Sequence, residues 1–180
     1  MLTIRTERLD LVAATFDHLE AELRSPSELA RLLGARVPAG WPPGEYDRQA
    51  MELFRARLAE DGGNAGWYGW YAILRPAECQ GGTVIGAGGF LGPPAADGTV
   101  EIGYSIVPEF EGQGFATELV RALVGRAFSA PGVMRVIAHT RPDNIGSVKV
   151  LERCGFSLAG PDSESSSVRY VLSRPTRPQR

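Results

Sequence analysis

The chain has 180 residues, of which 43% are hydrophobic and 22% charged, and its formal net charge is −2. These values fit one globular domain and argue against a nucleic-acid-binding protein, which would need a clustered basic surface. The two cysteines and two histidines are too few for a disulfide framework or a histidine-rich metal site, and no apolar run reaches 18 residues, so we expect a cytoplasmic protein that binds no metal and no membrane.

The first half of the chain is predicted to alternate between strands and short helices. A strand is expected over residues 2–14, with Thr6 and Glu7 marking a turn or bulge inside it. Three helices follow, at 16–24, 27–33 and 45–59. Two further strands are predicted, at 67–74 and 83–91, and the loop at 76–82 joins them as a hairpin.

The second half begins with the most informative stretch, a strand at 99–107 followed by a helix at 113–128. Strands are also predicted at 134–140, 156–159 and 168–173, and a last helix from Asp143 or Asn144 to Cys154. A helix that connects two adjacent strands makes them parallel, so 99–107 and 134–140 should form a parallel pair. We expect one domain over 1–173 and a disordered basic tail over 174–180.

The glycine-rich turn between the strand at 99–107 and its helix can bind an anion. Pro108 ends the strand, and Gly112 and Gly114 leave backbone amides uncovered at the positive end of the helix dipole. Phosphate binding and an ordinary strand-to-helix turn are both consistent with these glycines alone. The turn matches neither a nucleotide P-loop nor a dinucleotide fingerprint.

Two sequence blocks and a short N-terminal motif occur together in this chain. The first block is Glu101-Ile102-Gly103-Tyr104 followed by residues 108–118. The second block contains Asn144, Ser147, Val148, Leu151, Glu152, Gly155 and Phe156. Together they resemble the acetyl-CoA site of the GCN5-related N-acetyltransferases, the GNAT family. The motif Arg5-Thr6-Glu7-Arg8-Leu9 makes the chain similar to the RimJ/RimL-like branch of ribosomal-protein N-terminal acetyltransferases, over about residues 2–173.

The resemblance implies an α/β (α+β) GNAT acyl-CoA N-acyltransferase fold, with a mixed central sheet of about seven strands flanked by helices. In this family the fourth and fifth strands splay apart, and the pantetheine arm of the donor enters the gap. The donor would be acetyl-CoA. The residues implied to hold it are Ile106, Val107, Glu111, Gly112, Gln113, Gly114, Phe115, Ala116, Thr117, Asn144 and Ser147.

One position departs from the pattern of the family. The phosphate turn of these enzymes usually begins with Arg or Gln, whereas this chain has the carboxylate Glu111. The backbone amides can still hold a pyrophosphate, and we expect the side chain of Glu111 to point away from it.

The chemistry that the resemblance implies is acetyl transfer to an amine by direct attack in a ternary complex. No Ser-His-Asp or Cys-His arrangement favours a covalent acyl-enzyme. Glu101 is the candidate base, although a paired or solvent-facing Glu is an equal alternative. Ser147 is the candidate proton donor to the leaving sulfur, and an N–H near Ile106 or Val107 would stabilise the oxyanion. Tyr104 is a second proton-donor candidate, although its position on the apolar face suggests the core.

The amine acceptor is left open between a protein N-terminus and a small molecule. The residues that could contact it are Trp41, Tyr68, Trp70 and His139. The three aromatic residues could instead serve the core, and His139 could instead be a hydrogen-bonded structural histidine. An exposed aromatic strand at 67–74, or a last strand at the sheet edge, could support a homodimer. The alternative functions are a non-catalytic acyl-CoA-binding or regulatory module and an enzyme that uses a longer acyl-CoA.

Overall fold

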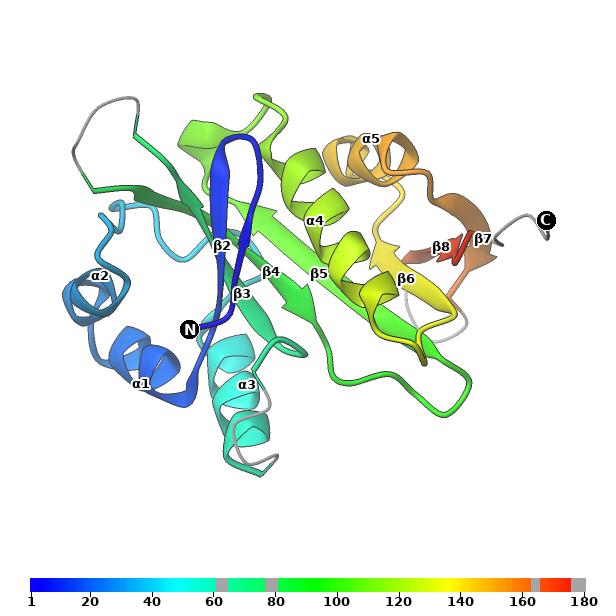
Figure 1. The fold of residues 1–180 in the computed structure, drawn as a ribbon. Coiled ribbons are helices and arrows are strands. Elements are labelled where there is room, and N and C mark those ends of the chain that lie inside the picture. The colour runs from blue at the N-terminus through cyan, green and yellow to red at the C-terminus, as the bar shows by residue number, and fades with distance from the viewer. Residues whose placement is uncertain (61–64, 77–80, 163–165, 176–180) are drawn as a thin grey trace.

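The computed structural model describes residues 1–60, 65–76, 81–162 and 166–175. Figure 1 follows the chain from blue to red through its strands and helices. The strands are β1 (Thr3–Arg5), β2 (Leu9–Ala13), β3 (Gly69–Leu74), β4 (Thr83–Phe90), β5 (Thr99–Ile106), β6 (Arg135–Thr140), β7 (Ser157–Pro161) and β8 (Val168–Ser173). The helices are α1 (Phe16–Arg24), α2 (Pro26–Leu33), α3 (Arg48–Glu60), α4 (Phe115–Ser129) and α5 (Ile145–Arg153). None of these helices is both long and apolar enough to cross a bilayer.

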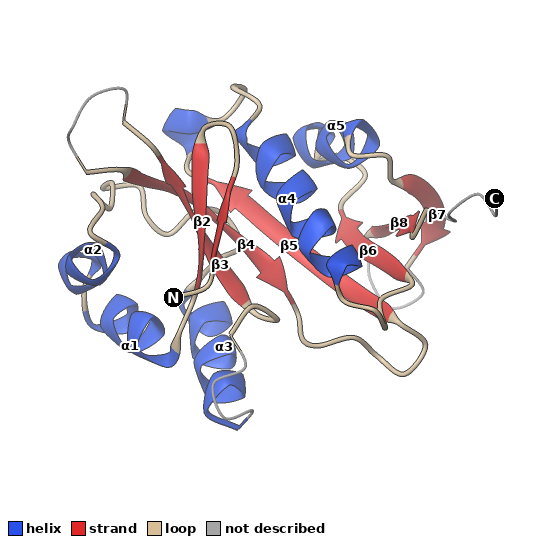
Figure 2. Cartoon of the chain, viewed as in Figure 1, coloured by secondary structure: helices blue, strands red, loops and turns tan. Residues whose placement is uncertain are grey.

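One sheet forms the centre of the molecule, with its eight strands in the order β1-β2-β3-β4-β5-β6-β8-β7 (Figures 1 and 2). Every neighbouring pair is antiparallel except β5 and β6, which are parallel because α4 crosses between them. These two strands pair only from Thr99 to Glu101 on β5. Beyond Glu101 they continue without pairing to each other, so the mixed sheet and its splay are confirmed.

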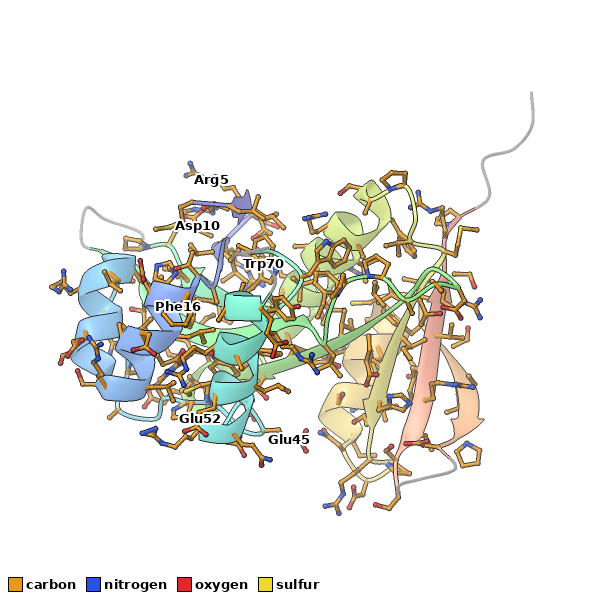
Figure 3. All side chains as sticks on the ribbon, turned by 90° about the horizontal axis from the view of Figure 1, so that it is seen from below. Arg5, Asp10, Phe16, Glu45, Glu52 and Trp70 are labelled. Atoms are coloured by element: carbon orange, nitrogen blue, oxygen red, sulfur yellow. The ribbon has the colours of Figure 1, made fainter. Side chains whose placement is uncertain are left out.

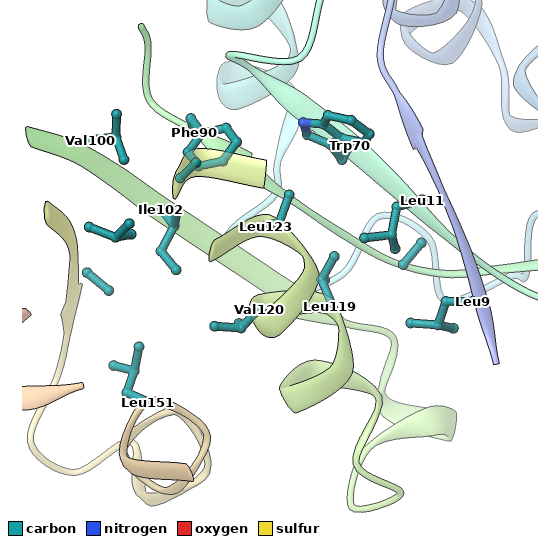
Figure 4. Close-up of a cluster of buried hydrophobic side chains, with 14 of the residues drawn as sticks. Leu9, Leu11, Trp70, Phe90, Val100, Ile102, Leu119, Val120, Leu123 and Leu151 are labelled. Carbon is teal, nitrogen blue, oxygen red and sulfur yellow. The ribbon is translucent and has the colours of Figure 1, made fainter. Parts of the chain in front are cut away.

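The alternation of side chains gives the sheet a hydrophobic core on each face. On β3, Trp70 and Ala72 pack with α4, whereas Tyr71 and Ile73 pack with α1, α2 and α3 on the opposite face. Figure 4 shows part of the first core, with Leu119 of α4 among the strand side chains. Burial on both faces explains why the sequence of β3 is almost continuously apolar.

The strand predicted at 2–14 is two strands joined by a tight turn, which raises the strand count from about seven to eight. The Thr6 N–H donates to the Leu9 carbonyl oxygen at 2.9 Å, and the Thr6 hydroxyl accepts from the Leu9 N–H at 3.0 Å. Arg75, just beyond β3, donates to the carbonyl oxygens of Thr6 at 2.8 Å and Leu9 at 2.7 Å. The turn signal at Thr6 therefore ends the strand instead of bending it.

The ends of the sheet and of the chain differ from the sequence predictions. The last strand, β8, is not at the edge because β7 lies outside it, and β3 is buried between β2 and β4. The two features on which the homodimer expectation rested, a last strand at the edge and an exposed aromatic strand, are therefore not found, and the homodimer itself stays a prediction. Arg174, the first residue of the predicted tail, is ordered, because its Nε donates to the Val133 carbonyl oxygen at 2.7 Å. Residues 176–180 and Cys79 lie outside the described residues.

Candidate active site

A cavity of about 490 Å³ opens where β5 and β6 splay apart. Residues 102–106 of β5, the end of β6, and the first turns of α4 and α5 line it. Gly44 and Glu45 line it as well, and their loop packs on the other face of the sheet through Trp41. The cavity therefore passes through the sheet and is open to groups from both faces. In Figure 3, which shows the molecule from below, Glu45 lies at the periphery and Trp70 in the interior.

The main chain of β5 presents one of the two predicted oxyanion donors to this cavity. Val107 donates its N–H to the Ile85 carbonyl oxygen at 2.8 Å, and Ile106 lies opposite Gly86 in the register. Backbone groups of neighbouring residues point to opposite sides of a strand, so the Ile106 N–H faces the unpaired side toward β6. The Val107 N–H is therefore not available as an oxyanion donor, because it is already bonded to the Ile85 carbonyl oxygen. The Val107 side chain is fully buried. Ile106 remains the candidate.

The turn before α4 has the free amides that its glycines predict. Gly112 and Gly114 adopt positive φ angles of 73° and 83°, a conformation that favours glycine. The first bond of the helix runs from the Glu118 N–H to the Gly114 carbonyl oxygen, so the N–H groups of 115–117 have no carbonyl partner within the helix. These amides, beside the positive end of the helix dipole, can bind an anion. Of the turn residues predicted to hold the donor, Gln113 alone does not line the cavity.

Arg8, which the sequence marked only as part of a family motif, lies beside this turn. Its Nη1 donates to the Gln113 carbonyl oxygen at 3.0 Å, and its Nε donates to Glu118 Oε2 at 2.8 Å. The guanidinium also stacks 4.2 Å from the centre of the Phe115 ring. A positive charge therefore adjoins a turn that begins with the carboxylate Glu111. Arg8 is more than a hundred residues away in sequence from Gln113 and Glu118, so no local sequence pattern predicts these contacts.

The start of α5 places two candidate proton donors against β5. Asn144 caps the helix, because its Oδ1 accepts from the Ser147 N–H at 3.0 Å. The hydroxyl groups of Ser147 and Tyr104 lie 2.9 Å apart, and all three residues line the cavity. Burial raises the pKa of Tyr104 to about 12, so the phenol keeps its proton at neutral pH. The apolar face on which Tyr104 lies suggested a core role, but its hydroxyl reaches the cavity wall.

Glu101 and His139 form a pair on the sheet face opposite α4. They come from adjacent strands, and His139 Nδ1 lies 2.7 Å from Glu101 Oε1. Their side chains are 30% and 27% exposed, respectively. His139 lines the cavity, and Glu101 adjoins it through the contact with His139 Nδ1. The sequence placed both residues on the polar faces of their strands but gave no sign of their contact.

The three aromatic residues predicted as acceptor contacts lie in the cores. Trp41, Tyr68 and Trp70 are 8%, 3% and 1% exposed, and none lines the cavity. Trp70 Nε1 donates to the Gly66 carbonyl oxygen at 3.3 Å, and Trp41 Nε1 donates to Glu22 at 2.7 Å. The cavity gives these three residues no route to a substrate, and their proposed role has no support here.

The described residues contain no cluster of three or more His, Cys, Asp or Glu side chains that could hold a metal ion.

Comparison with known proteins points to acyl transfer. Residues 8–157 match the family model described as an acetyltransferase (GNAT) domain. An uncharacterized N-acetyltransferase, YjdG of Bacillus subtilis (strain 168), is 29% identical over 95% of this chain and 99% of its own length.

Solved structures share the fold. A ribosomal-protein-S5-alanine acetyltransferase from Vibrio fischeri superposes with a TM-score of 0.64 at 16% identity, covering 96% of this chain and 97% of that one. The aminoglycoside acetyltransferase AAC(6′)-Ib, in complex with ribostamycin and coenzyme A, gives a TM-score of 0.64 at 23% identity, covering 93% of this chain and 94% of that one. At these identities the likeness shows the fold alone. The family match over residues 8–157 shows that the chain belongs to the GNAT family of acetyl-CoA-dependent N-acetyltransferases.

Proposed function

We propose that this enzyme transfers the acetyl group of acetyl-CoA to a primary amine, which attacks the thioester directly in a ternary complex. The observation that carries the proposal is the cavity through the splayed sheet. It is lined by the glycine turn before α4 and by His139, whose Nδ1 is bonded to Glu101. The donor would enter from the α4 and α5 face, and the acceptor from the side of Gly44 and Glu45.

The donor would be held along the whole cavity. The amides of 115–117 would bind its pyrophosphate, and Arg8 would hold the turn in place through its bond to the Gln113 carbonyl oxygen. The unpaired edge of β5 would bond the pantetheine arm as an added strand, as peptides do at sheet edges. Asn144 would contact a pantetheine amide. The Ile106 N–H would donate to the thioester oxygen as negative charge develops on it.

The leaving sulfur would receive its proton from the Ser147–Tyr104 pair. The two hydroxyls are hydrogen-bonded at 2.9 Å, so a proton given up by Ser147 can be replaced by Tyr104 across one contact. At the other end, the Glu101–His139 pair would take the proton that the amine loses. Both proton transfers then occur within side chains already in contact, and neither requires a covalent acyl-enzyme.

The acceptor class is proposed as either a protein N-terminal α-amine, as in the RimJ/RimL-like branch, or a small-molecule amine. The Vibrio fischeri enzyme and the ribostamycin complex represent these two classes on the same fold. An α-amine has a pKa of about 8 and is partly neutral at physiological pH. Such an acceptor would place a smaller demand on the base than a lysine side chain would.

Titration calorimetry with acetyl-CoA tests the donor site. We expect Gly114→Asp to weaken acetyl-CoA at least about tenfold, or about 1.4 kcal/mol, because a carboxylate would stand at the anion-binding amides. Gly125→Ala is the matched control, since Gly125 is exposed in the same helix with open space at its Cβ position. S-acetylpantetheine, which lacks the phosphates, should bind wild type and Gly114→Asp equally. Unchanged acetyl-CoA affinity in folded Gly114→Asp would exclude this turn as the phosphate site.

A panel of amines then tests turnover, with release of CoA thiol as the readout. The panel would contain peptides with a free N-terminal serine or alanine, ribostamycin, and spermidine. Acetylation of one member identifies the acceptor class. Tight acetyl-CoA binding without turnover on a broad panel would instead support the non-catalytic alternative.

A further inference from the structure

We infer that His139, and not Glu101, is the group that takes the proton from the acceptor amine, and that Glu101 positions its imidazole ring. The inference rests on the proposed amine acetylation and assigns its general base. His139 lines the cavity that the acceptor amine would enter, and Glu101 Oε1 is already bonded to His139 Nδ1.

The hydrogen bond between the two side chains fixes which ring nitrogen can act. His139 Nδ1 lies 2.7 Å from Glu101 Oε1, and a carboxylate can only accept. Nδ1 therefore carries the proton in the neutral ring, and Nε2 is left with a free lone pair. A general base needs such a lone pair within reach of the proton that it removes. The pair thus has the arrangement in which a carboxylate sets the tautomer and orientation of a histidine base.

The sheet holds this arrangement in place. Glu101 pairs with Ile137 in the last parallel step before the strands splay, so His139 lies two residues further along β6, on the same face. On its other side His139 lies opposite Arg169 of β8. The pair therefore sits at the narrow end of the splay, between two strands whose register leaves little freedom.

The charged groups around His139 come from four segments. Glu101 faces it from β5 and Arg169 from β8, Glu45 lines the same cavity from the loop before α3, and Arg141 follows it by two residues. Arg141 is paired with Asp143 at 2.7 Å, which reduces its effect on the ring. The carboxylate of Glu101 is the hydrogen-bonded partner among them.

Every proton that moves in the reaction has a donor and an acceptor among these groups. As the amine nitrogen forms its bond to the thioester carbon, it gives one proton to His139 Nε2. The C–S bond breaks, and the sulfur leaves as a thiolate that receives one proton from Ser147. Tyr104 supplies Ser147, and exchange with water then removes the proton from His139 and restores that of Tyr104.

A nitrogen NMR measurement tests the arrangement without any acceptor. The chain has two histidines, and the structure gives them opposite tautomers. His18 Nδ1 accepts from the Thr15 N–H at 3.2 Å, so its proton is on Nε2, whereas the proton of neutral His139 should be on Nδ1. Long-range nitrogen–proton spectra of labelled protein distinguish the two, and His18→Gln and His139→Gln assign the signals. A neutral His139 with its proton on Nε2 would overturn the inference, because no lone pair would face the acceptor.

Kinetics test the role itself with the acceptor found in the panel. We expect His139→Gln to lower kcat/KM for the amine roughly 10²–10⁴-fold and to leave acetyl-CoA affinity unchanged. His18→Gln is the matched control, because glutamine also suits the third position of the capping box that Thr15 begins. Added imidazole should partly restore His139→Ala, which a purely structural histidine would not show.

Glu101→Gln separates the positioning role from the catalytic one. The amide of the introduced glutamine can donate to His139 Nδ1, which would move the ring proton to Nε2. We expect both the activity and the NMR signal of the tautomer to change. If His139→Gln kept more than a third of the wild-type kcat/KM while Glu101→Gln lost a hundredfold, Glu101 would itself be the base. If acetyl-CoA bound but no amine were acetylated, the proposed amine acetylation would fail. The NMR measurement of the His139 tautomer would still test the arrangement of Glu101 and His139.

Discussion

A buried carboxylate on α1 shows how this fold holds a charge away from both solvent and the cavity. Glu22 is 7% exposed and accepts three hydrogen bonds, from Trp41 Nε1 at 2.7 Å, the Tyr46 hydroxyl at 2.9 Å and the Tyr71 hydroxyl at 2.6 Å. All three donors are neutral. We predict that Tyr71→Phe, which removes one hydroxyl and keeps the ring, destabilises the protein, because the carboxylate then loses a donor that water cannot replace.

The size of the effect follows from the kind of bond that is lost. A hydrogen bond to a charged group contributes about 1.5–3 kcal/mol net, so Tyr71→Phe should lower the free energy of unfolding by roughly 2 kcal/mol. For a chain of this length such a change corresponds to a fall in Tm of roughly 4–8 °C. Urea denaturation at pH 8 measures it, and an unchanged m-value shows that the two unfolding transitions are comparable.

The free-energy cost of Tyr71→Phe should depend on pH, and the burial of Glu22 determines in which direction. Burial raises the pKa of Glu22, and the three donors offset part of that rise. The stability that Glu22 contributes is therefore complete below its ordinary pKa of 4.5 and is lost as the pH rises through the folded-state pKa. Loss of the Tyr71 donor raises this pKa further, so the penalty of Tyr71→Phe is larger at pH 8 than at pH 4. Each additional pKa unit adds about 1.36 kcal/mol.

A tyrosine in the other core provides the control. Tyr170 is 5% exposed on β8, and no carboxylate is bonded to its hydroxyl among the described residues, so the effect of Tyr170→Phe should not change between pH 4 and pH 8. The reasoning fails if Tyr71→Phe costs less than about 0.5 kcal/mol. It also fails if the cost of Tyr71→Phe is the same at both pH values.

Three further changes have predictable effects on stability. Gly125→Ala should stabilise the protein by up to about 1 kcal/mol in thermal unfolding, because glycine is unfavourable inside an exposed helix. Leu119→Ala should cost about 2.7–5 kcal/mol in urea, because Leu119 is fully buried. Burial would raise the pKa of Glu118, but hydrogen bonds from Thr6 and Arg8 hold it below the ordinary value. Glu118→Gln should therefore destabilise at pH 7, and the difference should shrink as the pH falls below 4.5.

Most helices and strands could be predicted from the sequence because prolines and glycines mark their ends. The last strand, Val168–Ser173, has the predicted bounds, and α5 begins after Asn144 as its capping residue indicates. The hairpin at the start of the chain was missed because Arg75, from beyond β3, holds its turn. A contact between segments so far apart in sequence leaves no local pattern.

The sequence predicts the geometry of the candidate site only where it depends on local chemistry. The glycine turn before α4 and the Asn144 cap depend on neighbours within a few residues. The exclusion of Val107 depends instead on the register between β4 and β5, which assigns its N–H to Ile85. The contact between Glu101 and His139 likewise requires the register of β5 and β6. Side-chain parity placed both residues on a face but could not bring them together.

Glu22 and Glu101 are both held by side-chain donors, and their surroundings distinguish a structural role from the proposed catalytic one. Glu22 has three donors, all of which are buried with it, so a proton that it gained or lost would reach no substrate. Glu101 has one partner, and that partner lines the cavity. In the proposed mechanism, a change of charge at Glu101 would reach the acceptor through the imidazole ring of His139. Loss of a donor to Glu22 should accordingly alter the stability to unfolding and leave the pH dependence of turnover unchanged. Loss of the Glu101 carboxylate should alter the pH dependence of turnover and leave the stability to unfolding unchanged.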